Sequence, residues 1–121
     1  MKTVKTHKDL DVWKVGIELV KEIYMVTTQF PEEEKYGLTS QLRRAAVSFP
    51  SNIAEGAARI STKEFLRFLF ISQGSLAEID TQVIIAKELS FIDDIKYNSL
   101  DNKINRLGAL LGGLIASLRR K

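Results

Sequence analysis

Apolar residues recur along the chain at spacings of three and four, the period of an amphipathic α-helix, in four separate segments. The first segment covers residues 9–29 and ends at Phe30-Pro31, because a residue before proline is pushed out of the helical region. One apolar stripe on this helix consists of Leu10, Trp13, Ile17, Val20, Tyr24 and Thr27. A second stripe beside it consists of Val12, Leu19, Ile23, Val26 and Phe30. The first helix therefore has more apolar surface than a single stripe supplies.

The second segment covers residues 36–58 and has Pro50 inside it. Its inward positions are Leu38, Leu42, Ala45, Phe49 and Ile53. Proline removes one backbone hydrogen bond and clashes with the preceding turn, so we expect one kinked helix. The alternative is two short helices, the second of which begins at Pro50. The acidic run at residues 32–34 precedes this segment, where negative charge suits the helix dipole.

The third and fourth segments carry the longest regular patterns. Ser61 and Glu64 form a capping-box pattern at the start of the third helix. Its stripe consists of Phe65, Leu69, Ser72, Leu76, Ile79, Val83 and Ala86. Asp93 or Asp94 caps the fourth helix, whose stripe consists of Leu100, Ile104, Leu107, Leu111, Leu114 and Leu118. Small residues at 108–117 weaken this helix, so we expect another helix to approach closely there.

Four amphipathic helices joined by short loops predict an all-α fold, an antiparallel up-down-up-down four-helix bundle of one domain spanning residues 1–121. Residues 1–8 and 119–121 form basic tails. One stripe per helix would close the core of such a bundle, so the surplus apolar residues predict self-association. The candidate interface residues are Val12, Leu19, Phe68, Phe70 and Ile71. The alternative is that the last three of these fold under the tails or loops.

The chain has few residues suited to catalysis or to metal binding. It has no cysteine and one histidine, His7, which excludes thiolate sites and histidine pairs. Glu18 and Glu22 share a helix face, but lysines at helical spacing flank them, so we expect ion pairs in place of a magnesium site. We expect no enzyme activity and no cofactor. The longest apolar stretch, residues 107–118, is shorter than the roughly 20 residues that cross a bilayer, so we expect no membrane contact. The absence of cysteines fits a reducing compartment, and we expect a cytoplasmic protein.

Positive charge is clustered along the chain. The net charge is only +3, but residues 35–67 contain six basic and two acidic side chains, and the C-terminal tail is basic. Such a cluster attracts polyanions, so RNA or DNA is a candidate partner. The candidate phosphate contacts are Arg43, Arg59, Lys63, Arg67, Arg119, Arg120 and Lys121. The alternative is that these side chains form ordinary solvated helix faces.

Several polar residues of the second helix stand close to its inward face. A buried charge needs a partner, because an unpaired one costs several kcal/mol. We therefore expect an internal polar network formed by Arg44, Asn52, Glu55 and Glu78, with Gly74 allowing the second and third helices to approach. Either Arg43 or Arg44 is the structural arginine of this network, and the other faces solvent.

Motifs spread over nearly the whole chain resemble those of one known family. They are DLDVW at residues 9–13, Phe30-Pro31, YGLTSQLRRAA at residues 36–46, Ser48, PSNIAEG at residues 50–56, KEF at residues 63–65 and GSLAE at residues 74–78. With them the chain resembles the four-helix-bundle proteins encoded in intervening sequences of bacterial 23S ribosomal RNA genes. Phe49 departs from the isoleucine or valine that is usual in that family.

The resemblance implies a homo-oligomeric ring, with five copies as the expected number. The family is also similar to the accessory protein of diversity-generating retroelements, which forms such rings and binds nucleic acid and the reverse transcriptase. We therefore expect a non-catalytic oligomeric protein that binds nucleic acid, with RNA suggested by the location of the family's genes. The alternative is a protein–protein scaffold or accessory protein with no direct nucleic-acid role.

Overall fold

The structure is a computed structural model that describes residues 6–120, and all of its regular elements are helical. The four long helices are α1 (Asp11–Thr27), α2 (Leu38–Ala57), α3 (Thr62–Glu88) and α4 (Asp94–Arg119). Two short 3-10 helices precede α1 and α2, η1 (His7–Asp9) and η2 (Glu32–Glu34). The predicted all-α fold is confirmed. Helix α2 continues through Pro50, so the alternative of two short helices is wrong.

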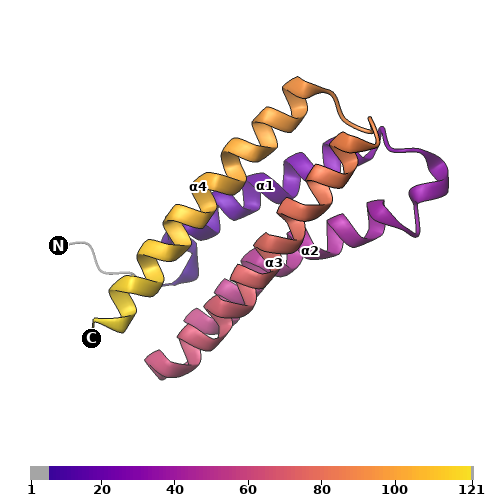
Figure 1. The fold of residues 1–121 in the computed structure, drawn as a ribbon. Helices are drawn as coiled ribbons and strands as arrows, with labels where there is room; N and C mark the ends of the chain where they lie inside the picture. Colours follow the sequence, from indigo (N-terminus) through magenta and orange to yellow (C-terminus); the bar gives the residue numbers. More distant parts are fainter. Residues whose placement is uncertain (1–5, 121) are drawn as a thin grey trace.

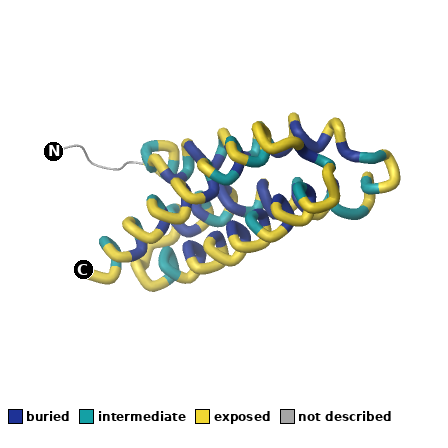
Figure 2. The backbone as a smooth tube through the Cα atoms, turned by 45° about the horizontal axis from the view of Figure 1, so that its top comes forward, coloured by how far each residue is buried: buried dark blue, intermediate teal, exposed yellow. Residues whose placement is uncertain are grey.

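The helices pack as a bundle in which each one runs antiparallel to the one before it (Figure 1). Helix α1 packs against α2 and α4, and α3 also packs against α2 and α4. Each helix therefore has two neighbours and needs two adjoining apolar faces. Figure 2 shows buried residues on the inner sides of all four helices and exposed residues outside.

This arrangement corrects part of the predicted subunit interface. Val12, Leu19 and Phe68 are only 0–6% exposed within a single chain. Each helix of a four-helix bundle contacts two others, so the second apolar stripe of α1 packs against the second of its two neighbours. Phe70 and Ile71 remain on the surface, with 39% and 42% of their area exposed.

The helix starts follow the predicted capping only in part. Ser61 Oγ accepts a hydrogen bond from the Glu64 amide at 3.1 Å, but the Glu64 carboxylate pairs with Arg67 and does not complete the box. Asp93 caps α4 by accepting from the Lys96 amide at 2.8 Å. The acidic run forms η2 as a separate turn, from which the Glu34 carboxylate accepts from the first amide of α2 at 3.0 Å.

The N-terminal residues also depart from the expected tail. Residues 6–9 form a capped turn in which Thr6 Oγ1 accepts from the Lys8 amide at 3.1 Å and the Asp9 carboxylate accepts from the Thr6 amide at 3.3 Å. The His7 ring meets Trp13 edge to face, with the ring centroids 5.1 Å apart. Residues 6–9 are therefore attached to α1.

Helices α2 and α3 approach each other over small residues. Ser48 and Ser75 share a hydrogen bond of 2.9 Å between their hydroxyls, and Ser72 Oγ donates to the Phe49 carbonyl at 2.8 Å. At the end of α2, a Cβ atom added to Gly56 would lie 2.7 Å from the Cβ of Phe68. The two backbones can pack this closely only because these positions have little or no side chain.

The predicted internal charge network does not form. Arg44, Glu55 and Glu78 are all exposed, and Glu55 pairs with Arg59 on its own helix at 3.7 Å. Only Asn52 is in a partly buried cluster, where its Nδ2 donates to the Ser48 carbonyl and hydroxyl at 2.9 and 3.0 Å. The space between α2 and α3 is filled by small hydroxyl side chains, which are less costly to bury than charges.

The small residues of α4 do not meet another helix of the same chain. A Cβ atom added to Gly112 or Gly113 would have no neighbour within 4 Å, and one added to Gly108 would reach only Leu76 at 4.0 Å. The predicted close approach of a helix at this face is therefore wrong within the bundle. None of the described helices is both long and apolar enough to span a membrane.

The close approach at Gly56 predicts that Gly56→Ala destabilises the protein. The added methyl would lie 2.7 Å from Phe68 Cβ and 2.9 Å from Phe65 Cδ1, so the helices must move apart. Overpacking of this kind costs about 1–3 kcal/mol, more than the roughly 1 kcal/mol that alanine adds through helix propensity. Urea denaturation should show a lower free energy of unfolding. The matched change Gly112→Ala, in open space, should raise it, and equal effects at both positions would contradict this packing.

Candidate nucleic-acid interface

Three of the predicted phosphate contacts line one groove at the end of the bundle. Lys63 and Arg67 come from the first turns of α3, and Arg119 comes from the last turn of α4. Antiparallel packing of α3 and α4 brings these two helix ends together. The groove has a volume of about 590 Å³, and its apolar residues are Leu66, Phe70 and Leu118. We call this site, with its three cations and its apolar residues, the basic groove.

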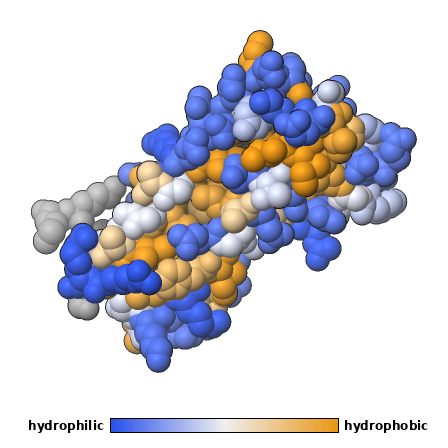
Figure 3. All heavy atoms as spheres, viewed as in Figure 1, coloured by the Kyte–Doolittle hydropathy of each residue, from blue (hydrophilic) through white to orange (hydrophobic). Residues whose placement is uncertain are grey.

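The surface around the basic groove combines the two kinds of side chain. Figure 3 shows hydrophobic side chains along the junction of α3 and α4, with strongly hydrophilic ones around the C-terminal end of α4. A basic rim over an apolar floor is suited to a ligand that has both negative charge and flat apolar surface.

Aromatic rings hold the arginines of this region in place. Arg119 lies over the Phe70 ring, with its guanidinium carbon 5.0 Å from the ring centroid. Arg59 and Arg67 both lie over Phe68, at 4.9 and 4.6 Å. Stacking uses the face of a guanidinium and leaves its N–H edges available to donate hydrogen bonds. The arginines are therefore positioned without losing their capacity to bind an anion.

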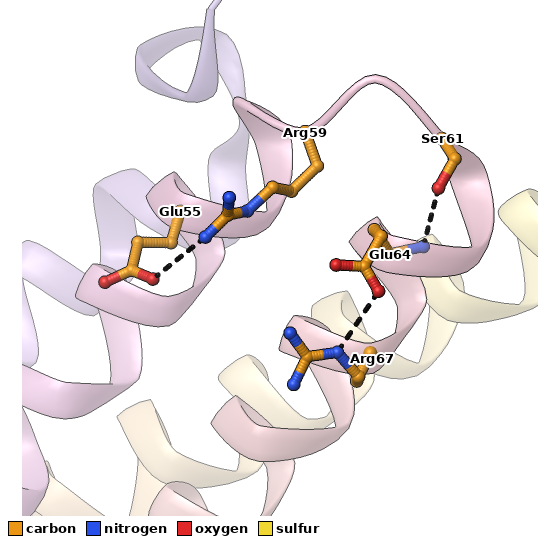
Figure 4. A network of polar contacts seen from close by, with 5 residues as sticks. All are labelled: Glu55, Arg59, Ser61, Glu64 and Arg67. Carbon is orange, nitrogen blue, oxygen red and sulfur yellow. Dashed lines mark hydrogen bonds and ion pairs between the residues drawn. The ribbon is translucent and has the colours of Figure 1, made fainter.

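Two of these arginines also have carboxylate partners. Arg59 pairs with Glu55 at 3.7 Å, and Arg67 pairs with Glu64 at 3.3 Å (Figure 4). All four side chains are about half exposed, and exposed pairs of this kind contribute about 0–1 kcal/mol. A phosphate can therefore replace either carboxylate at little cost.

The other described cations of this end of the bundle are in no ion pair. Within residues 6–120, neither Lys63 nor Arg119 has a carboxylate at ion-pair distance. Arg120 is exposed directly after α4, and Lys121 lies outside the described residues. The predicted phosphate contacts of α3 and α4 are thus near one another, as the antiparallel order of the helices requires.

Arg43 lies elsewhere, is partly buried and is bonded to α1. Its Nε donates to Thr27 Oγ1 at 2.8 Å, and one terminal nitrogen donates to the Tyr24 carbonyl at 3.4 Å. Its guanidinium also lies over the Tyr24 ring at 4.6 Å, so it joins α2 to the end of α1. Arg44, which we expected in an internal network, is exposed. Of the two adjacent arginines, Arg43 is therefore the structural one.

Sequence reasoning missed the apolar part of the basic groove. It placed Phe70 in a subunit interface, whereas the structure places this ring beneath Arg119. Leu66 and Leu118 were not singled out for this site, although both line it. The sequence could have indicated these residues, because antiparallel order places the start of the third helix beside the end of the fourth.

The carboxylates considered for a metal site have other surroundings. Glu22 accepts a hydrogen bond from Lys103 Nζ at 2.8 Å, and this partly buried ion pair joins α1 to α4. Among the described residues, no three histidine, cysteine or carboxylate side chains are grouped closely enough to hold a metal ion.

The family model of the 23S rRNA-intervening sequence protein matches residues 8–113. The chain belongs to this family. No curated protein sequence matches it. A solved structure with the same fold is a protein of unknown function from the S23 ribosomal protein family of Bacteroides thetaiotaomicron VPI-5482. It superposes with a TM-score of 0.77 at 21% sequence identity, covering 86% of this chain and 97% of that one. At this identity the likeness shows the fold, and no function follows from it.

The contacts of Arg43 predict that Arg43→Ala destabilises the protein and that Arg44→Ala does not. The first change removes a hydrogen bond to the buried Thr27 hydroxyl and a stacked cation, for a loss of about 1–2 kcal/mol. The second removes an exposed side chain, which usually changes stability by less than about 0.5 kcal/mol. Urea denaturation of both variants measures the difference. A larger loss for Arg44→Ala would contradict the assignment of Arg43 as the structural arginine.

Proposed function

We propose that this member of the 23S rRNA-intervening sequence family is a non-catalytic, self-associating protein that binds nucleic acid through the basic groove. The observation that supports this most directly is the convergence of Lys63, Arg67 and Arg119 on one groove from two different helices. RNA is the expected ligand because the family is named for sequences that interrupt a ribosomal RNA gene. A cytoplasmic location is part of the same proposal.

The basic groove supports a single-stranded ligand better than a rigid duplex. When phosphates bind the cations of the rim, the nucleic acid releases its counterions, and this release favours binding to the protein. Phe70, with 39% of its area exposed, supplies an aromatic surface next to these cations on which an unpaired base can stack. Stacking of this kind depends little on the identity of the base, so the expected recognition is of strand and charge rather than sequence.

Self-association would strengthen such binding. Each chain has a net charge of only +3, which gives a single copy a weak field. An assembly repeats the basic groove, so one nucleic-acid strand can engage several copies at once. The outer face of α3 supports association, because Ile71, Ile84 and Ile85 are large apolar residues that remain exposed. A ring of five copies is the assembly that we propose.

A scaffold for another protein is the second candidate. The apolar residues Leu66, Phe70 and Leu118 between basic side chains also suit an acidic amphipathic helix. Nucleic-acid binding measurements separate the two candidates, because a scaffold of this kind has no affinity for RNA or DNA at physiological salt.

Neutralising the basic groove should weaken nucleic-acid binding and make it less sensitive to salt. In the triple variant Lys63→Gln, Arg67→Gln, Arg119→Gln, each lost phosphate contact lowers the slope of log K against log salt by about 0.7 on single strands and 0.9 on duplex. Fluorescence anisotropy with labelled RNA and DNA over a salt series measures this slope.

The matched control removes the same charge from other parts of the surface. Lys21, Lys35 and Lys96 are exposed and do not line the basic groove, so their triple change to glutamine should leave most of the affinity intact. An equal loss in both triple variants would show that net charge alone drives binding. Absence of RNA and DNA binding by the unaltered protein would favour the scaffold.

The molar mass of the protein in solution tests the proposed assembly. Light scattering after size exclusion should give a multiple of the 13.7 kDa chain mass, and five copies would match the proposed ring. A particle of one chain at high concentration would reject self-association while leaving the binding experiment to decide the role of the basic groove.

A further inference from the structure

The connection between α2 and α3 exposes an isoleucine at its tip. Ile60 lies between the end of α2 at Ala57 and the start of α3 at Thr62, and its side chain is fully exposed, at 106%. It is the most exposed large apolar residue within residues 6–120. Single apolar side chains are common on protein surfaces, so exposure alone indicates no ligand. The side chains around Ile60 determine what it can contact.

The backbone on both sides of Ile60 is held by hydrogen bonds. In the last turn of α2, the Arg59 amide donates to the Gly56 carbonyl at 3.1 Å. In the first turn of α3, Ser61 Oγ accepts from the Glu64 amide at 3.1 Å. Figure 4 shows the chain arching directly from Arg59 to Ser61 between the two helix ends. Because the arch is this short, the two helices fix the position of the Ile60 backbone.

Cations flank the tip on both sides. Arg59 directly precedes Ile60, and Lys63 and Arg67 follow on the first turns of α3. The guanidiniums of Arg59 and Arg67 both lie over the Phe68 ring, at 4.9 and 4.6 Å, so two of these charges are held next to the same ring. Lys63 and Arg67 also line the basic groove. The apolar tip therefore adjoins the site at which phosphates are proposed to bind.

This combination of positive charge and one exposed apolar side chain favours a nucleic acid over a lipid membrane. Phosphates bound in the basic groove bring nucleobases close to the tip, and every base has a flat face that packs against other groups. Apolar wedges, isoleucine among them, insert between neighbouring bases in many proteins that bind nucleic acid. A membrane anchor needs more apolar surface, because even one myristoyl chain, which is much larger than the Ile60 side chain, gives only marginal binding.

We infer that Ile60 is a wedge residue, which inserts between two neighbouring bases of the strand that binds in the basic groove. Arg59 and Lys63, on either side of Ile60 in the chain, bind the phosphates next to these bases. Separating two bases costs less in a single strand than in a paired duplex, so the wedge favours an unpaired or locally distorted strand. This inference rests on the proposed nucleic-acid binding and adds to it a contact with two stacked bases.

Removing the apolar side chain at the tip tests the inference. Ile60→Ser should lower the affinity for labelled single-stranded RNA about tenfold, because the apolar area that the bases bury is lost. The slope of log K against log salt should stay unchanged, since no phosphate contact is removed. Ile60→Leu keeps an apolar wedge and should bind like the unaltered protein. Fluorescence anisotropy over a salt series measures both quantities, and circular dichroism checks that the variants fold.

Two controls separate a contact with bases from other effects. Inorganic polyphosphate presents a chain of negative charge without bases, so Ile60→Ser should bind it as tightly as the unaltered protein does. Ile95 is also an exposed isoleucine, at 82%, but lies in the first turn of α4, roughly 36 Å along that helix from Arg119. Ile95→Ser should therefore leave RNA binding unchanged.

An indole at the tip gives a direct signal of stacking. Ile60→Trp should lose tryptophan fluorescence when unlabelled RNA binds, because bases that stack on an indole quench it, and polyphosphate should leave the signal unchanged. Ile95→Trp should respond to neither ligand. Trp13 is the one tryptophan of the natural sequence and contributes the same background to both variants.

Four results would overturn the inference. Absence of RNA binding by the unaltered protein would remove the proposed function together with the wedge. Full RNA affinity of Ile60→Ser, or an equal loss of affinity for RNA and polyphosphate, would reject only the wedge. A lower particle mass of Ile60→Ser in light scattering would place the side chain between copies of the chain. If RNA affinity is retained while binding to phosphatidylglycerol vesicles is lost, Ile60 is a membrane contact.

Discussion

The contact between α2 and α3 is the constraint on which the other features of the bundle depend. Ser48, Ser72 and Ser75 hydrogen-bond across or along it, and Gly56 leaves room for Phe68 at its end. Small side chains allow the two backbones to approach, and the approach in turn leaves no space for charges between them. The charged residues of both helices are consequently on the outside. The basic groove uses residues that this packing directs outward.

At the corner where α2 passes into α3, the same packing produces an array of cations. Phe68 is buried against Gly56, and the outer face of its ring supports Arg59 and Arg67. A few residues along α3, Phe70 supports Arg119 from the end of α4. The aromatic residues therefore have two roles, because they pack against apolar groups and also orient the guanidinium groups of the arginines. A chain with a small net charge thereby has several of its arginines oriented at one end of the bundle.

The sequence by itself determined the four helices, their antiparallel order and several of their caps, because apolar periodicity and capping residues act locally. Ser61 and Asp93 cap the helices that their patterns indicated. Only the tertiary structure decided the direction of each polar and aromatic side chain near the contact between two helices. Arg43 points to Thr27 and Arg44 to solvent, although they are neighbours in the chain. Val12 and Leu19 are internal because a helix in a bundle of four faces two others, a property of the packing that no single helix contains.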